Sequence, residues 1–155
     1  YLVSPADGSI TAIVDVNGTV ELGLENKKFT RVSIFMNVFN CHVNRAPSSG
    51  EIEDIFYKPG KFLNASLDKA SEENERNYFK IKDNKTTDSI VVVQIAGLIA
   101  RRIITQVHKK QTVIQGQRLG MIRFGSRVDI YFTQRKTMVK VGQSVIAGES
   151  LIASV

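Results

Sequence analysis

The sequence predicts a mainly β domain, a β-rich α+β chain folded as a compact barrel or sandwich. Three observations support this class. Apolar and polar residues alternate over several short stretches, glycines and other turn residues separate those stretches, and no low-complexity segment or linker interrupts them. The 155 residues are enough for one domain with a hydrophobic core. We therefore predict a single domain over residues 1–155.

The order of the predicted elements follows from these patterns. Asn17-Gly18, a strong two-residue turn signal, predicts a hairpin within residues 9–22. The polar stretch 67–77 fits either a helical turn or a loop. The tail 139–153 resembles the last hairpin of biotinyl- and lipoyl-carrier folds. Further strands are predicted at 29–39, at 51–57, twice within 77–95, and at 101–107, 118–124, 127–132 and 150–155.

Charge and composition narrow the choice of partner. The formal net charge of +6 favours an anionic partner such as a phosphorylated ligand or an anionic lipid surface. Aromatic residues make up only 8% and are not interleaved with the basic ones, so we predict no nucleic-acid partner. The most apolar run, residues 90–100, is far shorter than the ~20 residues of a membrane-spanning helix. We also predict no metal site.

Gly125-Ser126 interrupts an otherwise regular strand pattern between Gly120 and Phe132. Strand interiors avoid glycine, so a β-bulge or a strand-to-turn step is one interpretation. The other is self-cleavage, in which the serine hydroxyl attacks the preceding carbonyl. Glycine permits the strained backbone that such an attack requires.

Two further residues are candidates for activating that serine. His42 stands near the end of an apolar stretch, where it is either structural or a general base. Asp7 lies in a Pro-x-Asp-Gly sequence, which is a turn signal, but a carboxylate could also orient and stabilise His42. The sequence alone does not show that Asp7, His42 and Ser126 meet.

Several long motifs, taken together and in order, resemble the phosphatidylserine decarboxylase family, specifically its short type related to archaetidylserine decarboxylases. The resemblance covers essentially the whole chain. Its motifs are "VSPADGSI" at 3–10, "FMNVFNCHVNRAPSSGEI" at 35–52, "PGKFLNASLDKASEENERN" at 59–77, "VVQIAGLIARRI" at 92–103 and "GQRLGMIRFGSRVDIYF" at 116–132.

The resemblance implies a pyruvoyl-dependent enzyme that decarboxylates phosphatidylserine to phosphatidylethanolamine and CO2. The precursor would cut itself between Gly125 and Ser126, giving a large chain 1–125 and a small chain 126–155 that remain associated. Ser126 would become a covalent pyruvoyl group, whose ketone forms a Schiff base with the substrate amine. Asp7 and His42 would assist the cleavage, and His42 would also protonate the product carbon.

The resemblance also carries weaker implications for substrate and membrane binding. Long-type relatives carry a second histidine three residues after the first, where this chain has Arg45. We expect Arg45, Asn44 and Arg127 to contact the substrate carboxylate or phosphate. The family has an apolar membrane-attachment segment upstream of residue 1, so we expect a peripheral protein on the cytoplasmic face of the cell membrane. Its basic residues would bind anionic lipid, and the α/β heterodimer could form higher oligomers.

A non-catalytic carrier or binding module of the biotinyl/lipoyl type is the alternative. It rests on the C-terminal hairpin pattern and needs an exposed lysine at a hairpin tip, for which Lys136 is the candidate. It leaves the first two-thirds of the chain unexplained. Only the decarboxylase hypothesis predicts that the chain breaks at one peptide bond.

Overall fold

The fold is built almost entirely from β-strands, which confirms the predicted class. The computed structural model describes residues 1–36, 43–62, 64–65, 73–97, 103–123 and 125–155. Besides one 3₁₀ turn, η1 (Val20–Leu22), these form fourteen strands. The strands are β1 (Leu2–Val3), β2 (Gly8–Asn17), β3 (Lys28–Met36), β4 (Val43–Arg45), β5 (Gly50–Lys58), β6 (Arg76–Asp83), β7 (Ser89–Ile95), β8 (Ile103–Thr105), β9 (Thr112–Val113), β10 (Arg118–Ile122), β11 (Ser126–Phe132), β12 (Lys136–Thr137), β13 (Ser144–Val145) and β14 (Leu151–Ser154).

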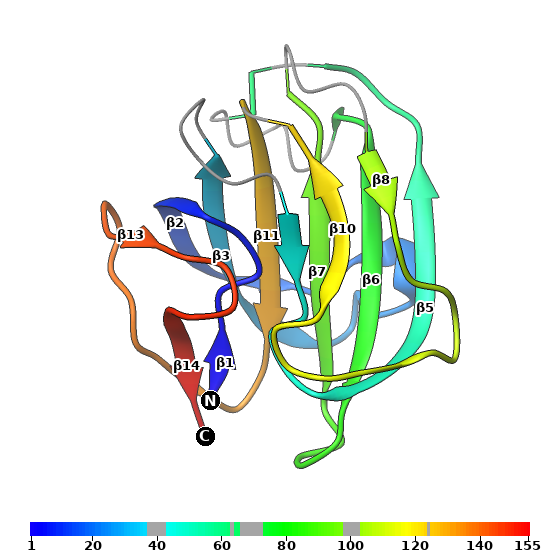
Figure 1. The fold of residues 1–155 in the computed structure, drawn as a ribbon, viewed down its shortest axis with the longest axis vertical. Coiled ribbons are helices and arrows are strands. Elements are labelled where there is room, and N and C mark those ends of the chain that lie inside the picture. The colour runs from blue at the N-terminus through cyan, green and yellow to red at the C-terminus, as the bar shows by residue number, and fades with distance from the viewer. Residues whose placement is uncertain (37–42, 63, 66–72, 98–102, 124) are drawn as a thin grey trace.

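One large antiparallel sheet dominates the molecule and curls like half a barrel (Figure 1). Its eight strands follow the order β13-β2-β3-β11-β7-β6-β5-β9. Two three-stranded sheets, β4-β10-β8 and β1-β14-β12, complete the fold. In the view of Figure 1, the β4-β10-β8 sheet lies in front of the large sheet, so a core forms between the two layers.

Strand β11 occupies the middle of the large sheet, paired with β3 on one side and β7 on the other. Its first residue, Ser126, pairs with Met36 at the end of β3. All seven residues of β11 are buried. Side chains alternate between the two faces of a strand, and the faces of β11 pack into two different hydrophobic clusters.

The inner cluster lies between the layers and forms the main core. From β11 it takes Val128, Ile130 and Phe132, and it joins them to Leu119 and Ile122 of β10. The outer cluster on the opposite face contains Phe29, Tyr78, Val91, Val93, Ile95 and Tyr131. Both faces of the large sheet therefore bury apolar residues, which explains why its strands do not alternate strictly between apolar and polar residues.

The predicted tight hairpin at Asn17-Gly18 is wrong. Strand β2 instead pairs with β3 through a longer connection, with Asn17 opposite Lys28. Residues 20–22 form the 3₁₀ turn η1, and Leu22 packs on the outer cluster. Burial of an apolar side chain on the outer face therefore outweighed the local turn preference.

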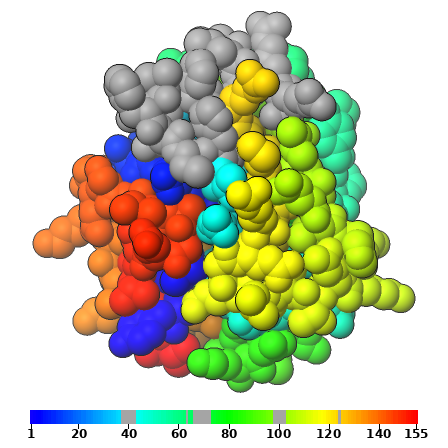
Figure 2. All heavy atoms as spheres, in the orientation of Figure 1, coloured from blue at the N-terminus to red at the C-terminus, as the bar shows by residue number. Residues whose placement is uncertain are grey.

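The two chain ends meet on one side of the molecule, where Figure 2 shows the first and last residues packed together. Strand β14 pairs with both β1 and β12, while β13 pairs with β2. The segment after residue 125 therefore contributes strands to two sheets that also contain strands from before it. Within the described residues, no helix is long and apolar enough to cross a bilayer.

Candidate functional site

Gly125 makes a sharp turn immediately before the central strand. Its φ of 76° lies in the left-handed region, which glycine adopts without the steric penalty that a Cβ brings. The Gly125 N–H donates to the Met36 carbonyl oxygen at 2.6 Å, so the turn is tied to the end of β3. The glycine in the Gly-Ser pair is therefore required by the backbone geometry at this bond.

The carbonyl group of Gly125 packs directly against the backbone of Gly97. A Cβ added at Gly97 would clash with the Gly125 carbonyl oxygen and would also touch the Ala65 side chain. Because no side chain intervenes, the carbonyl of the Gly125–Ser126 bond has its position fixed by backbone on one side. Such fixed geometry favours an intramolecular attack on that carbonyl.

Ser126 is completely buried at the start of β11. Its hydroxyl donates a hydrogen bond to the Arg123 carbonyl oxygen, three residues earlier in the chain. The Ser126 hydroxyl oxygen also lies 3.7 Å from the Met36 sulfur. A thioether is only a weak hydrogen-bond acceptor, so the Arg123 carbonyl oxygen is the main hydrogen-bond partner of the Ser126 hydroxyl, and both of these neighbouring groups are neutral.

Asn44 of β4 lies close to the same sulfur. Its side chain is fully buried, and its Nδ2 is 3.9 Å from the Met36 sulfur. Its Oδ1 accepts a hydrogen bond from Gln94 Nε2 at 2.9 Å. The structure thus brings Asn44 and Ser126 to one methionine at the end of β3.

Asp7 lies at the same end of the large sheet, just before β2. Ser9 pairs with Phe35 on one side of β3, while Ser126 pairs with Met36 on the other. Adjacent strands are about 4.8 Å apart, which puts β2 and β11 about 10 Å apart. Asp7 Oδ1 accepts a hydrogen bond from the Ala147 N–H at 2.7 Å, which ties it to the segment that follows the Gly-Ser bond.

His42 lies outside the described residues, so the predicted grouping of Asp7, His42 and Ser126 stays a prediction. The described residues that flank it are placed as follows. Met36 ends β3 beside Ser126, and Val43 begins β4 opposite Met121 of β10.

The two predicted arginines differ in their surroundings. Arg127 points to the outer face, away from Ser126, and is 2% exposed. Its guanidinium pairs with Asp129 through Nε to Oδ1 at 3.0 Å and Nη2 to Oδ2 at 3.1 Å. Arg45 is partly exposed, and its Nη1 donates to the Gly116 carbonyl oxygen at 2.7 Å. The geometry favours Arg45 over Arg127 as a substrate ligand, and both assignments stay predictions.

Three residues that the structure places at this site were not predicted from the sequence, namely Met36, Gln94 and Gly97. A signal existed for Gln94, because it is the one polar residue in the apolar run 90–100. Gly97 stands in the same run and is a second irregularity in it. Met36 carries no such signal, since it looks like any apolar residue of a strand.

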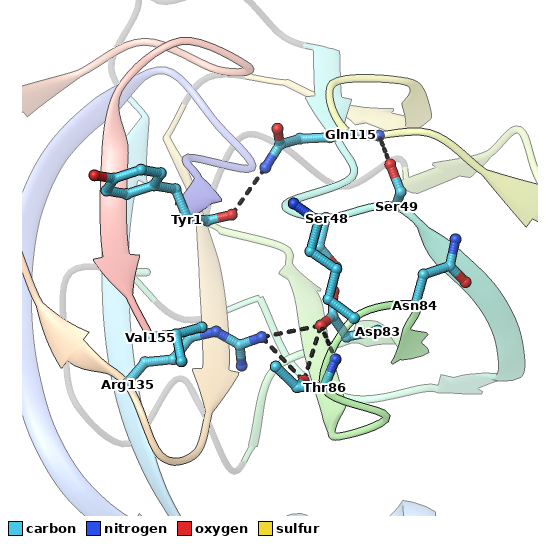
Figure 3. A pocket seen from close by; sticks show the side chains of 10 residues that line it. Tyr1, Ser48, Ser49, Asp83, Asn84, Thr86, Gln115, Arg135 and Val155 are labelled. Carbon is cyan, nitrogen blue, oxygen red and sulfur yellow. Dashed lines mark hydrogen bonds and ion pairs between the residues drawn. The ribbon is translucent and has the colours of Figure 1, made fainter.

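A polar pocket of about 280 Å³ opens near the chain ends, beyond the other end of β11 (Figure 3). Arg135 there donates from Nη2 to Asp83 Oδ2 at 3.2 Å. Burial opposes ionisation of Asp83, but hydrogen bonds from Thr86 and Ser48 and the charge of Arg135 outweigh it and lower the pKa of the carboxyl. The Asp83 carboxylate is therefore satisfied within the protein, and this pocket is separate from the Gly125–Ser126 site.

Comparison with known proteins identifies the family. A sequence model of the family described as phosphatidylserine decarboxylase matches residues 1–153. The chain belongs to the phosphatidylserine decarboxylase family. This confirms the family and the class of enzyme that the sequence motifs predicted.

Two curated relatives are both named phosphatidylserine decarboxylase proenzyme. The one from Pelagibacter ubique is 63% identical over 153 residues, which cover 99% of this chain and 71% of the relative. The one from Nitrobacter winogradskyi is 54% identical, over 98% of this chain and 62% of the relative. The chain therefore spans roughly two thirds of the length of these relatives.

The carrier alternative required Lys136 at a hairpin tip. In the structure, Lys136 lies in β12 opposite Ser154 of β14.

Proposed function

We propose that this chain is the catalytic part of a pyruvoyl-dependent phosphatidylserine decarboxylase whose precursor cuts itself between Gly125 and Ser126. One observation carries the proposal. A fully buried serine follows a left-handed glycine whose carbonyl is packed against backbone, in the middle of an otherwise regular sheet. A strand-to-turn step would not require all of these features at one bond.

The cleavage chemistry balances without any outside reagent except water. The Ser126 oxygen attacks the Gly125 carbonyl carbon, the amide nitrogen accepts a proton, and the peptide bond becomes an ester. Loss of the Ser126 α-proton then expels Gly125 as a carboxylate and leaves dehydroalanine at the new chain end. Dehydroalanine tautomerises to an imine, and water hydrolyses the imine to a ketone and ammonia.

Within this scheme the chain's own residues have separate tasks. The Ser126 hydroxyl must first give up its hydrogen bond to the Arg123 carbonyl before a base can take its proton. His42 is the proposed base, and Asp7 would orient it. The bond between Asp7 and the Ala147 N–H supports this role, because it fixes the carboxylate beside the end of β3.

The sheet topology supports continued association of the two chains after cleavage. Strand β11 starts at Ser126 and is paired along its length with β3 and, over much of it, with β7. Cutting the bond before Ser126 removes none of these strand pairings. The new small chain would also keep β13 on β2 and β14 on β1.

The pyruvoyl ketone would supply an electrophile for the substrate amine and an electron sink for the decarboxylation. Residue 126 suits this group, because it is buried away from water beside neutral side chains. Asn44 and Arg45 are the proposed contacts of the phosphatidylserine head group, with Arg127 the less favoured candidate. We further propose peripheral binding to the cytoplasmic face of the cell membrane through basic residues, each contributing about 1 kcal/mol near an anionic surface.

Mass spectrometry of the intact purified protein, beside a Ser126→Ala variant, tests the proposal. We expect two chains from the wild type, with the 126–155 chain lighter by one ammonia than simple hydrolysis would give. The variant should stay whole. Wild-type protein should then release CO2 from phosphatidylserine vesicles, whereas the variant should release none.

Two results would contradict the proposal. A wild-type chain that stays whole in the presence of lipid would leave the enzyme without its electrophile. A small chain with an unmodified serine at its end would show cleavage without formation of the pyruvoyl group.

A further inference from the structure

A row of buried side-chain amides runs from the interior of the sheet toward Ser126. Gln94 of β7 lies in its middle and is fully buried. It stands opposite Val128 of β11, two residues along that strand from Ser126. Two residues along on a neighbouring strand is close enough for long side chains to interact with a common partner.

The orientation of the Gln94 amide is fixed by chemistry. Its Nε2 lies 3.4 Å from the carbonyl oxygens of both Ile104 and Met121. Carbonyl oxygens only accept hydrogen bonds, so the nitrogen of the amide must face them. The oxygen, Oε1, accepts from Asn77 Nδ2 at 3.3 Å, and that nitrogen also donates to Thr105 Oγ1 at 3.1 Å.

This orientation in turn fixes Asn44. Because Gln94 Nε2 donates to Asn44 Oδ1, the Asn44 nitrogen must point the other way, toward the Met36 sulfur. The sulfur is 3.9 Å from that nitrogen and 3.7 Å from the Ser126 hydroxyl oxygen. A buried N–H donor thus faces a weak acceptor beside the reacting residue, although buried donors normally have strong partners.

We infer that Gln94 is a positioning residue which, together with Asn77, aims the Asn44 N–H at a carboxylate oxygen of the substrate's serine head group. The inference rests on the proposed function. After cleavage, residue 126 no longer carries its hydroxyl, and the space beside the Met36 sulfur can take an oxygen of the substrate. A neutral amide binds a carboxylate more weakly than a guanidinium does, so it orients the group without strongly favouring the state that must lose CO2.

Gln94→Met and Asn44→Asp test the two parts of this inference. Gln94→Met keeps the size of the side chain but removes both hydrogen-bonding groups, which leaves the Asn44 amide free to rotate. Asn44→Asp keeps an acceptor for Gln94 but turns an oxygen toward the substrate. In matured enzyme assayed with short-chain phosphatidylserine in micelles, we expect KM to rise about tenfold in Gln94→Met and about a hundredfold in Asn44→Asp. We expect kcat to change much less.

Ile52→Val provides the control, since Ile52 is a buried core residue of β5 outside the amide row. It should lower Tm slightly and leave KM unchanged. If Gln94→Met lowers Tm but leaves KM at the wild-type value, the amide row is merely structural and the inference is overturned. If Gln94→Met stays uncut while Ile52→Val is cut, the row serves cleavage and the assignment to the substrate is wrong. Wild-type protein that is itself uncut or inactive would overturn the proposed function, a different result from either.

Discussion

The two faces of strand β11 carry opposite kinds of side chain. The inner face presents Ser126 and then only apolar residues, while the outer face presents Arg127, Asp129 and Tyr131. Ser126 and Arg127 are neighbours in sequence, yet the alternation of a strand directs them to opposite sides. The difference shows how one strand can bury charged side chains on one face while the other face, which carries Ser126, stays neutral.

The outer face can hold its charges because they are paired. Asp129 is fully buried and lies between Arg127 and Arg31, whose Nε is 4.0 Å from Asp129 Oδ2. Burial and the Asp129 charge raise the pKa of Tyr131, so this phenol stays neutral beside the pair. On the inner face, by contrast, the Arg123 carbonyl and the Met36 thioether that Ser126 contacts are both neutral.

Arg127→Met would break this comparison most strongly. Removing one partner of a buried ion pair costs about 3–5 kcal/mol of folding free energy, because Asp129 stays buried and charged. Urea unfolding, measured in the uncut Ser126→Ala background, should show this loss. The Arg127→Met/Asp129→Leu double variant should recover only part of it, because it also removes the carboxylate that lies 4.0 Å from Nε of the buried Arg31. Both variants, made with Ser126 intact, should still be cut before Ser126, and a selective rise in KM without loss of stability would instead favour Arg127 as a substrate ligand.

Gly97→Ala tests whether cleavage before Ser126, on the inner face, depends on the position of the Gly125 carbonyl. The added methyl group would clash with that carbonyl and displace it. A displacement near 1 Å can slow an intramolecular reaction by about a hundredfold, so we expect uncut chain to accumulate in time-resolved mass spectrometry. Gly50→Ala is the matched control, because its Cβ would clash with the Lys82 carbonyl in the same way, far from the bond. Equal cleavage rates in the two variants would contradict this prediction.

Asp83→Asn extends the comparison to the other end of β11, where Asp83 and Arg135 form a buried ion pair at 3.2 Å. Losing the charge-assisted bond to Arg135 should cost about 2 kcal/mol at neutral pH. The pKa of Asp83 is lowered in the folded state, so this stabilisation is complete above the unfolded value near 4 and disappears as the pH falls through the folded value. Thermal unfolding of wild type and variant should therefore converge in acid. Cleavage should be unaffected.

Glu21→Gln should have the smallest effect. Burial opposes ionisation of Glu21, but the hydrogen bond from Lys58 at 2.9 Å and the charges of Lys58 and Arg76 lower its pKa. This carboxylate helps to hold η1 over the outer face, and its partner Lys58 is partly exposed to solvent. We expect a loss of about 1 kcal/mol that shrinks in high salt. A loss that does not change with salt would show that packing of η1, and not charge, holds it there.

Much of the fold was predictable, since strand patterns and turn residues mark most elements. The tight hairpin predicted at Asn17-Gly18 did not form, which shows the limit of local turn signals. Leu22 instead packs on the outer cluster, and no local sequence pattern indicates that contact. At the candidate site, Gly125 and Ser126 were predicted from the sequence alone, because a Gly-Ser pair visibly interrupts the strand pattern. Their role in cleavage stays a prediction. Gln94 was not singled out, although a lone polar residue in an apolar run marks a buried hydrogen-bonding group.

The sequence by itself determined the β-rich class, the family and the bond at which we expect cleavage, because each of these depends on local residue patterns or on sequence motifs. Only the tertiary structure decided what surrounds that bond. Met36 ends β3, Asn44 lies in β4, and Gln94 and Gly97 lie in and just after β7, so their approach to Gly125-Ser126 depends on the strand order of the sheets. Alternation along β11 already puts Ser126 and Arg127 on opposite faces. The tertiary structure decided which of these faces is the core, because register is set by packing of the whole sheet.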